Sequence, residues 1–491
     1  MRLAVKPADP IMWKPSQRIR YKAAPGEWPS TTEAANSALF SPLAYQALEL
    51  ESRTWVPAMV PWRATDSGFV TADNLDWYGR FARGRPAALV VEATGIRDIA
   101  SGPLLRVSDD RFIPGLKELV TKVRNASSGQ TRLFIQLIDF LPVRRRPAPA
   151  TYFQRYLQIT DRHRDALNAR GWPEHELREA LARLPVEELD SVLTPRELES
   201  LRMGYRERVT DTHLPQISEL PEILPALFSQ AAERAQQAGF DGVELHYAHA
   251  YTMASFLSAT NNRDDGYGGT LRQRLRLPLE VYTAVRKSVG SDFAVGCRFL
   301  TEDCIDAGST LADGSFFGQE FAAAGMDFIS VSRGGKFDDA RQPRVGEAAY
   351  PYTGRSGYEC IPGYISDDFG PFGRNVEPAS RVRAAIRKGD LETPVVVTGG
   401  IHGFHQAEAL LESSRADVIG MARQSLADPD WFRKVRAGQG RSVRVCEYTN
   451  YCEGLDRKHK QVTCQLWDRT GLDEPGISRS RDNKRRLVAP D

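Results

Sequence analysis

The chain has 491 residues, of which 41% are hydrophobic, and its 65 Lys and Arg side chains nearly balance its 63 Asp and Glu side chains. A chain of this length can bury one large core and has room for one to three domains. The formal net charge of +2 gives no general attraction to nucleic acid or to an anionic membrane. No apolar run reaches the roughly 18 residues of a membrane-spanning helix, and the first residues are too charged and proline-rich for a secretory signal. We therefore expect a soluble, cytoplasmic protein.

The chain divides by composition into three parts. Residues 1–38 are polar and contain several prolines, and we expect an arm that lies on the surface or on a partner subunit. Residues 39–440 alternate short apolar runs with helix-like segments, and residues 441–491 hold a cysteine-containing extension and a basic, disordered-looking tail. The eight apolar runs are Trp55–Trp62, Ala87–Thr94, Arg132–Ile138, Gly242–Ala248, Phe293–Leu300, Phe328–Arg333, Val395–Gly400 and Val418–Arg423.

Near-continuous apolar runs, most of them followed by a helix, are typical of parallel strands that are buried on both faces. Eight such units predict an α/β fold of the TIM (β/α)8 barrel type. An open, doubly wound sheet is the alternative, but no GxGxxG sequence follows the first strand, so its usual dinucleotide signature is missing. Periodicity and capping predict helices at Phe112–Asn125, Leu224–Gln237, Leu271–Val289, Gly318–Ala324, Ala379–Arg387, His405–Leu411 and Trp431–Arg436.

The connection between the third and fourth predicted strands is far longer than one crossover helix requires, at about 100 residues. Its helical patterns at Tyr152–Ala169, Glu176–Leu184 and Pro195–Arg208 predict a helical insertion at about residues 140–220. Loops that follow barrel strands emerge at the C-terminal face, so we expect this insertion to act as a lid or as an oligomerisation element. Its arginine run, Arg144–Arg146, is interpreted as a solvated face, with phosphate binding as the alternative.

Titratable side chains cluster where the fourth predicted strand ends, within DGVELHYAHAYTMASFLSATNNRDDGYGGTLRQR. His246, His249 and Tyr251 follow one another closely after the buried strand pattern. An Asn-, Asp- and Gly-rich loop over 261–269 comes next, before a helix that opens at Thr270. Two histidines and a tyrosine in this spacing favour a functional site over satisfied core residues.

The ends of the predicted strands resemble those of the Old Yellow Enzyme family of FMN-dependent oxidoreductases. The stretch AGFDGVELHYAHAY with NNRDDGYGGTLRQR carries the most specific likeness, and LFSPL, VVVTGG and VIGMARQSLADPDW add to it. The likeness extends from about Leu39 to Gly438, with the long insertion as its main departure. It implies that FMN lies across the barrel mouth, with its phosphate near the seventh and eighth strands.

The resemblance assigns flavin-binding roles by position. Arg298 matches the arginine that faces the N1/C2=O edge of the flavin, and Gln136 matches the glutamine that hydrogen-bonds the pyrimidine edge. Gly399 and Gly400 match the loop that approaches the phosphate, and Ala422 stands where the family usually has glycine. The other matched positions are Ala58, Met59, Val60, Ala93 and Arg423.

The resemblance also assigns catalytic roles. His246 and His249 match the pair that donates hydrogen bonds to a substrate oxygen over the flavin, where they stabilise a developing enolate. Tyr251 matches the tyrosine that delivers a proton to the α-carbon. Together they imply NAD(P)H-driven reduction of an alkene conjugated to a carbonyl or acyl group, with hydride passing from FMN to the β-carbon.

Oxidative demethylation or dehydrogenation of an amine is a second function of this scaffold. Amine-oxidising relatives of the trimethylamine dehydrogenase type carry an aspartate on the sixth strand, where this chain has Ser330, and the difference weakens this alternative. Tyr350, Tyr352 and Tyr358 follow that strand and could line the substrate cavity, although packing within a loop is the interpretation we favour. The sequence does not identify the substrate.

Six cysteines in this length do not form a disulfide scaffold, but three of them lie in VRVCEYTNYCEGLDRKHKQVTC. This segment resembles the iron–sulfur region of the branch that contains 2,4-dienoyl-CoA reductase and trimethylamine dehydrogenase. Cys446, Cys452 and Cys464 match three ligand positions, whereas Thr449 stands at the fourth, and a [4Fe–4S] cluster normally takes four thiolates. A three-cysteine cluster, a zinc site or free thiols without a cluster remain open, and the last is favoured.

In that branch the cluster connects FMN to an appended FAD/NAD(P)-binding region, which does not follow Cys464 in this sequence. We therefore expect electrons to come directly from NAD(P)H at the FMN, or from a separate partner protein. An electron-transfer flavoprotein subunit with an iron–sulfur site is the third function considered. We expect a small-molecule substrate, no nucleic-acid or membrane partner, and a homo-oligomer.

Overall fold

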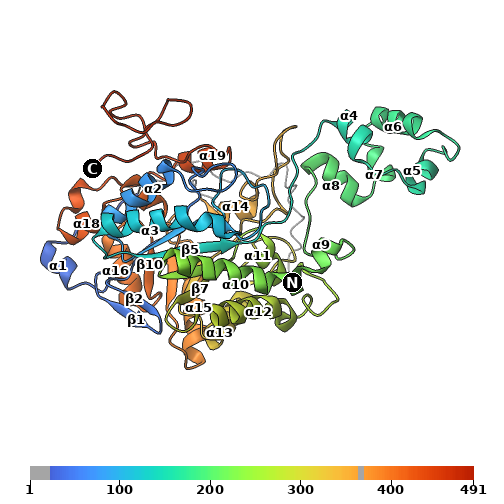
Figure 1. The fold of residues 1–491 in the computed structure, drawn as a ribbon. Coiled ribbons are helices and arrows are strands. Elements are labelled where there is room, and N and C mark those ends of the chain that lie inside the picture. Colours follow the sequence, from blue (N-terminus) through green and yellow to red (C-terminus); the bar gives the residue numbers. More distant parts are fainter. Residues whose placement is uncertain (1–22, 363–369) are drawn as a thin grey trace.

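A closed barrel of eight parallel strands forms the centre of the computed structural model, which describes residues 23–362 and 370–491. The strand order is β10-β3-β4-β5-β6-β7-β8-β9, and helices surround the barrel (Figure 1). Each strand overlaps one predicted apolar run, so the predicted TIM barrel is confirmed. The strands are β3 (Thr54–Val56), β4 (Ala88–Gly95), β5 (Arg132–Ile138), β6 (Gly242–Tyr247), β7 (Ala294–Leu300), β8 (Ile329–Ser332), β9 (Val395–Thr398) and β10 (Val418–Gly420).

An aromatic cluster fills the barrel interior near the N-terminal ends of the strands. The ring of Trp55 packs against those of Phe134 and Phe328, with centroid separations of 5.1 and 5.0 Å, and the two phenyl rings contact each other at 5.4 Å. Two glycines make room for these rings: a Cβ at Gly242 would lie 2.7 Å from Phe134, and one at Gly296 would lie 2.5 Å from Phe328. Because this end is packed, the C-terminal ends of the strands are left to form a site.

The helices around the barrel lie at predicted positions, except for α2 (Ala72–Arg83) and α17 (Arg423–Ala427), for which no helix was predicted. The others are α3 (Ile113–Ser127), α10 (Leu220–Ala238), α12 (Leu271–Val289), α13 (Leu311–Ala323), α15 (Val376–Lys388), α16 (Phe404–Glu412) and α18 (Trp431–Arg436). Helix α13 begins earlier than predicted, because Thr310 and Asp313 form a capping box at its start. No helix in the described ranges is long and apolar enough to span a bilayer.

Several short elements were not predicted, since three to six residues give too little periodicity to detect. Helix α2 was also missed, although Thr71 and Asn74 form a capping box at its start. The short elements are α1 (Thr31–Ala35), the hairpin strands β1 (Leu43–Tyr45) and β2 (Leu48–Leu50), α11 (Thr252–Leu257), α14 (Arg355–Cys360) and α19 (Tyr451–Asp456).

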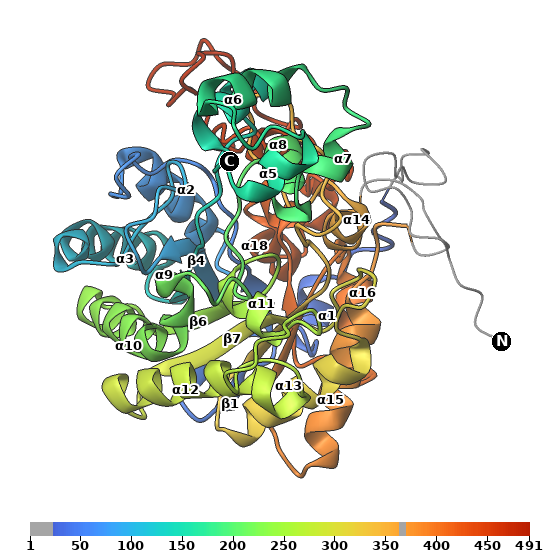
Figure 2. The ribbon, with the colours of Figure 1, turned by 90° about the vertical axis from the view of Figure 1, so that its right-hand side faces the viewer.

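The long insertion between β5 and α10 carries a lobe of helices with a hydrophobic core of its own, which we call the helical lobe (residues 149–203). The lobe lies at the edge of the molecule, beside the barrel (Figures 1 and 2). Its elements, with α9 beyond them, are α4 (Pro149–Thr151), the π-helical turn η2 (Tyr152–Tyr156), α5 (Asp161–Ala166), α6 (Glu174–Arg183), α7 (Leu189–Val192), α8 (Pro195–Met203) and α9 (Pro215–Ser218).

Two helices predicted in the insertion are wrong in extent. The prediction over Tyr152–Ala169 is divided into η2 and α5, because Thr160 begins a new helix with a capping box. The helix predicted over Pro195–Arg208 ends at Met203 in the structure. Gly204 stops it there with φ 91°, and a Cβ at Gly204 would lie 2.3 Å from the carbonyl oxygen of Arg144.

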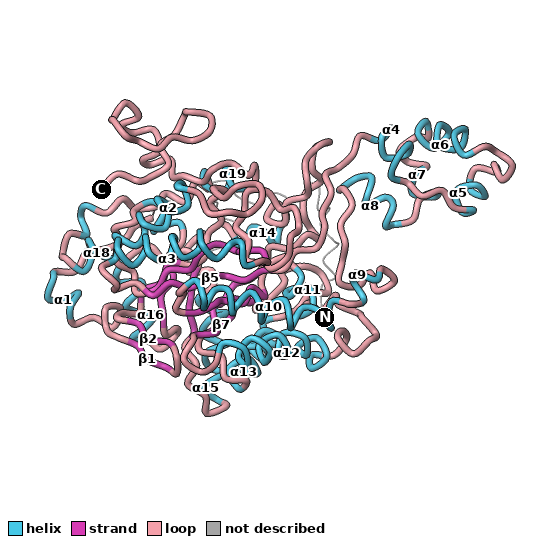
Figure 3. Tube along the Cα trace, viewed as in Figure 1, coloured by secondary structure: helices cyan, strands magenta, loops and turns pink. Residues whose placement is uncertain are grey.

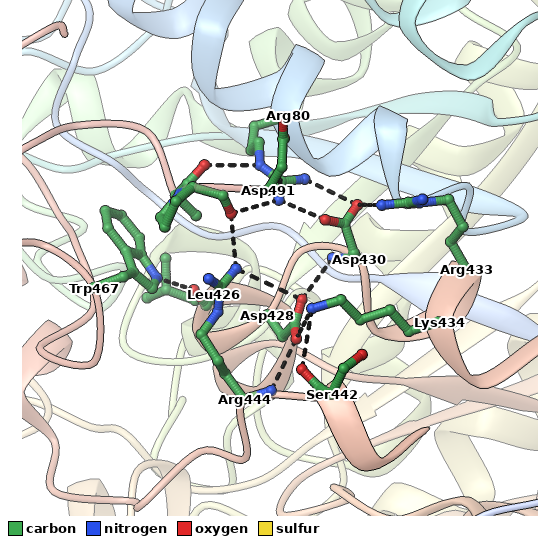
Figure 4. Close-up of polar contacts among 12 residues, drawn as sticks. Arg80, Leu426, Asp428, Asp430, Arg433, Lys434, Ser442, Arg444, Trp467 and Asp491 are labelled. Carbon is green, nitrogen blue, oxygen red and sulfur yellow. Dashed lines mark hydrogen bonds and ion pairs between the residues drawn. The ribbon is translucent and has the colours of Figure 1, made fainter. Parts of the chain in front are cut away.

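The C-terminal extension packs against the barrel helices and is loop after α19 (Figure 3). Arg80 of α2 donates to the carboxylate of Asp430 at 2.6 Å and to the carbonyl oxygen of Ala489 at 2.9 Å (Figure 4). The indole nitrogen of Trp467 donates to the carbonyl oxygen of Leu426 at 2.9 Å. These contacts tie the middle and the C-terminal end of the extension to the barrel.

The basic residues of the tail are donors within this fold, which corrects the expectation of a disordered tail. Arg485 donates to the carbonyl oxygen of Gln461 at 2.7 Å, and Arg486 donates to that of Val488 at 2.9 Å. Both arginines are buried. Composition alone suggested disorder because it does not reveal that guanidinium groups will find backbone acceptors.

Candidate active site

A cavity of about 900 Å³ opens at the C-terminal ends of the barrel strands. This volume is near the upper end of the range for ligand pockets, which leaves room for a cofactor together with a substrate. The cavity brings together every position matched to flavin binding or catalysis. The lining includes Ala58, Met59, Val60, Ala93, Gln136, His246, His249, Tyr251, Arg298, Gly399, Gly400, Ala422 and Arg423.

The two histidines contact one another at the end of β6. Nδ1 of His249 lies 3.3 Å from Nε2 of His246, and Nε2 of His249 lies 3.1 Å from Oγ of Ser332. Burial, with a smaller effect of Arg298, lowers the pKa of His246 to about 3. Burial and the neighbouring His246 likewise hold the pKa of His249 well below its usual value. Both imidazoles are therefore neutral near pH 7, and each carries one N–H that it can donate.

Tyr251 begins α11 and places its ring against His246. The ring centroids are 5.6 Å apart in an edge-on arrangement, and Phe140 packs on Tyr251 at 5.1 Å. Burial raises the pKa of Tyr251, and the nearby charge of Asp456 raises it further. The phenol therefore keeps its proton until a stronger base is formed beside it.

Arg298 on β7 pairs with His246 on β6 in the barrel register. Its Nε atom is buried and has no hydrogen-bond partner among the described residues. Gln136 donates to Glu244 at 2.5 Å, and the second carboxylate oxygen of Glu244 is buried without a partner in the described part of the chain. Burial raises the pKa of Glu244, and Arg298 opposes that rise. Glu244 was not predicted, although a carboxylate inside an otherwise apolar strand is a signal that could have found it.

The two glycines after β9 take conformations that suit close backbone approach. Gly399 has φ 146° and Gly400 has φ 70°. A Cβ at Gly400 would lie 1.9 Å from the carbonyl oxygen of Pro371, and one at Gly399 would lie 2.9 Å from the amide of Asn375. No side chain larger than glycine fits here, and exposed backbone amides in such a turn are suited to an anion.

Arg423 lines the cavity but is already engaged by the C-terminal extension. Its guanidinium donates to the side-chain oxygen of Asn450 at 2.6 Å and to the carbonyl oxygen of Pro362 at 3.0 Å. It also lies over the ring of Tyr448, 4.6 Å from the centroid. The predicted positive charge thus lines the same cavity as Gly400, and the extension fixes its position.

These features fit a flavin mononucleotide. The partnerless Nε of Arg298 is suited to the polar edge of a heteroaromatic ring, and the Gly399–Gly400 turn is suited to a phosphate. The segment Ala58–Val60, with Ala93 opposite, offers small and apolar surface to a flat ring system.

The three clustered cysteines do not form a metal site in this structure. Cys452 lines the cavity, and the thiols of Cys446 and Cys464 lie close enough to affect one another electrostatically. Burial raises the pKa of Cys452 to about 12. Within residues 23–362 and 370–491, no three His, Cys, Asp or Glu side chains are grouped as metal ligands. An iron–sulfur site is therefore not shown for these cysteines.

The structure adds cavity residues that sequence reasoning missed or set aside. Tyr350 and Tyr352 line the cavity, contrary to the favoured interpretation of loop packing, whereas Tyr358 is buried in α14 and is not part of the lining. Lys336 and Asp456 also line the cavity, the first paired with buried Asp303 at 3.3 Å. Loop residues carry no periodicity, so only the folded chain could show where they converge.

Comparison with known proteins supports a flavin enzyme. Residues 218–441 match the model of the NADH:flavin oxidoreductase / NADH oxidase family. A metal reductase of Desulforamulus reducens is 29% identical over 434 residues, which cover 87% of this chain and 53% of that protein. An NADH oxidase of Thermoanaerobacter brockii is 26% identical over 413 residues, covering 83% of this chain and 52% of that protein. The chain thus spans about half the length of these two relatives.

A multifunctional alkene reductase/demethylase of Caballeronia cordobensis is 29% identical over 230 residues, which cover 46% of this chain and 30% of that protein. Solved structures share the barrel fold. A 2-naphthoyl-CoA reductase aligns with a TM-score of 0.63 and 18% identity over 90% of this chain and 59% of its own. An Old Yellow Enzyme homologue from Zymomonas mobilis aligns with a TM-score of 0.52 and 20% identity. The alignment covers 81% of this chain and 92% of that one. The resemblance predicted from the sequence is therefore confirmed: residues 218–441 match the NADH:flavin oxidoreductase / NADH oxidase family, and the chain shares the barrel fold of these solved structures.

Proposed function

We propose that this protein is an ene-reductase, which uses NAD(P)H to reduce an alkene conjugated to a carbonyl or acyl group. The observation that carries the proposal is the arrangement of His246, His249 and Tyr251 on one cavity wall. Two neutral imidazoles, one of which has an N–H free for a ligand, stand there beside a phenol that keeps its proton. Bound FMN supplies the hydride chemistry of the reaction.

The protein residues act on the charge and the proton of the substrate. An N–H of His246 or His249 binds the carbonyl oxygen and stabilises the negative charge that develops there as the alkene is reduced. Tyr251 then delivers its proton to the α-carbon, which completes addition of hydrogen across the double bond. Arg298 lies beside this wall, where its charge favours an electron-rich reduced cofactor.

The flavin-binding roles are part of the same proposal. The Gly399–Gly400 turn and Arg423 hold the phosphate, and Gln136 and Arg298 hold the polar edge of the ring system. The base of the insertion contributes Arg145 and residues 206–210 to the cavity lining, which supports a role as a lid over the mouth. A homo-oligomer and a separate electron-donor protein remain compatible with this arrangement.

Amine oxidation is the competing function, since the name of the Caballeronia cordobensis relative joins alkene reduction with demethylation. Ser330 pairs with Arg298 on the neighbouring strand, at the position where an amine-oxidising relative would carry aspartate. An amine enzyme would lack its usual carboxylate there, so we favour alkene reduction. An electron-transfer subunit is disfavoured because the three cysteines are not placed as cluster ligands.

One experiment separates these functions. The protein is purified anaerobically, its visible spectrum and iron content are recorded, and NADH, NADPH and methylated amines are tested as reductants of the bound flavin. An ene-reductase is bleached by NADH or NADPH and reoxidised by 2-cyclohexenone. Bleaching by an amine would favour amine oxidation, and a colourless protein without flavin would contradict the proposal.

A further inference from the structure

A carboxylate from the C-terminal extension lies on the same cavity wall as Tyr251. Asp456 is the last residue of α19, and it lines the cavity together with Trp62, Tyr350 and Tyr352. These residues come from the loops after β3 and β8 and from beyond the barrel. The extension therefore supplies part of the active-site wall.

Both oxygens of this carboxylate are held by donors. The indole nitrogen of Trp62 donates to Oδ1 at 2.6 Å, and the hydroxyl of Tyr350 donates to Oδ2. Burial raises the pKa of Asp456, while these two hydrogen bonds lower it. Two donors directed at one carboxylate stabilise its ionised form and fix its orientation.

The contacts continue from Asp456 to Tyr251. The ring of Tyr350 meets that of Tyr352 edge-on, with centroids 5.2 Å apart. Tyr352 packs against His249 at 5.4 Å, and its hydroxyl forms a hydrogen bond with Tyr251. Asp456 is also the charged group with the largest electrostatic effect on Tyr251.

We propose that Asp456 is a positioning residue for Tyr251, acting through Tyr350 and Tyr352. The carboxylate holds Tyr350, Tyr350 orients Tyr352, and Tyr352 fixes the hydroxyl of Tyr251 toward the substrate. The negative charge also opposes ionisation of Tyr251, so the phenol remains protonated until the substrate α-carbon accepts the proton. This inference rests on the proposed role of Tyr251 as proton donor.

The test uses Asp456→Asn and, as a matched control, Glu453→Gln, which removes a carboxylate that comes from the same helix and lines the same cavity but is not among the groups that shift the pKa of Tyr251. Difluorotyrosine is placed at position 251 in each protein, and its ionisation is followed by fluorine NMR across pH. Asp456→Asn should lower the pKa of this group by roughly one unit relative to the control, because a nearby negative charge is lost. Equal pKa values in the two variants would overturn the proposal.

The kinetic test uses single turnover of 2-cyclohexenone with unlabelled, NADH-reduced enzyme. Asp456→Asn should reduce the rate constant for enone reduction about 10-fold, with little change in the substrate concentration at half-maximal rate. The rate of flavin reduction by NADH should be the same in Asp456→Asn and Glu453→Gln. Tyr350→Phe should produce part of the loss, because it keeps the charge and removes one donor. Equal rates in Asp456→Asn and Glu453→Gln would contradict the inference.

The spectrum of the bound flavin and circular dichroism show whether each variant is folded. If the wild-type protein reduces no enone, the proposed function fails, but the fluorine titration still decides whether Asp456 controls Tyr251. If enone is reduced and the two carboxylate variants behave alike, only the role of Asp456 fails. The two failures are thus distinguishable.

Discussion

The barrel mouth and the helical lobe both carry many polar side chains, but they satisfy them differently. In the lobe, charged groups pair with one another: Arg178 with Glu174 at 2.7 Å, and Arg202 with Asp190 at 2.7 Å. At the mouth, the Nε of Arg298 is buried without a partner among the described residues. Buried polar groups are normally hydrogen-bonded, so an unsatisfied one indicates a place where a ligand supplies the partner.

The apolar groups of the two regions differ as well. The lobe buries Leu177 and Leu181 in a small core but leaves Trp172 44% exposed and Tyr156 55% exposed. The mouth instead arranges half-buried aromatic residues around a cavity. The comparison therefore predicts that changes at the mouth affect chemistry, whereas changes in the lobe affect local stability.

The largest expected effect is that of Tyr251→Phe. Loss of the phenolic proton should slow alkene reduction by about 10²- to 10⁴-fold, the usual contribution of a positioned acid, while reduction of the flavin by NADH is spared. Stopped-flow measurement of the two half-reactions gives both values. Tyr156→Phe in the lobe is the control and should leave both rates unchanged. Equal loss of the two half-reactions in Tyr251→Phe would refute a proton-donor role.

His246→Ala should have the next largest effect. Removing one N–H donor to a developing negative charge typically costs about 10²- to 10³-fold in rate. We expect that loss in kcat for 2-cyclohexenone, with a normal flavin spectrum. His175→Ala, on the exposed surface of the lobe, is the control and should keep wild-type kcat. Full activity in His246→Ala would assign the substrate oxygen to another donor.

Leu177→Ala tests the prediction that changes in the helical lobe affect local stability. Cutting a fully buried leucine down to alanine costs about 2–5 kcal/mol of local stability through lost contacts and a cavity. The lobe should then exchange amide hydrogens and be cleaved by protease faster, as mass spectrometry can show, while flavin binding is retained. Loss of flavin in this variant would show that the lobe and the barrel unfold as one unit.

The smallest expected effect is a pH dependence of stability at His246. Its pKa is about 3 in the folded protein and about 6.5 in an unfolded chain. Below pH 6.5 the unfolded state binds more protons, so stability falls by about 1.4 kcal/mol for each pH unit until the folded pKa is approached. His246→Asn removes this contribution.

Urea unfolding of wild type and His246→Asn at pH 7 and pH 5 measures that difference. The wild-type protein should lose about 2 kcal/mol more than the variant over this interval, since 1.5 pH units lie below 6.5. Above pH 7 the difference between the two proteins should be constant. A pH-independent difference throughout would mean that folding does not lower the pKa of His246.

The barrel was predictable because one sequence pattern, a short apolar run, is repeated along the chain. Each strand from β3 to β10 is a short apolar run, and parallel strands must bring their C-terminal ends to one face. This geometry alone places His246, Arg298 and Gly399 around a common cavity once the strands are identified. The flavin-binding positions needed the family resemblance in addition, since no local pattern identifies Gln136 or Ala58.

The parts that were not predicted depend on long-range contacts. Asp456 joins the site only because the C-terminal extension folds back along the barrel, and nothing near it in sequence indicates this. Tyr350 and Tyr352 lie in a loop without periodicity. The π-helical turn of the lobe was not predicted either, because Tyr152–Tyr156 has the composition of an ordinary helix.

The 3.3 Å contact between the two histidines limits what they can offer to a ligand. Since both rings are neutral, one of the two facing nitrogens must carry the hydrogen and the other must not. Whichever tautomers are present, one N–H is consumed within the pair and only one remains for the substrate. A ligand oxygen that takes both N–H groups must therefore separate the two rings and break their contact. Substrate binding would then be coupled to a movement of the histidine rings before any reduction takes place.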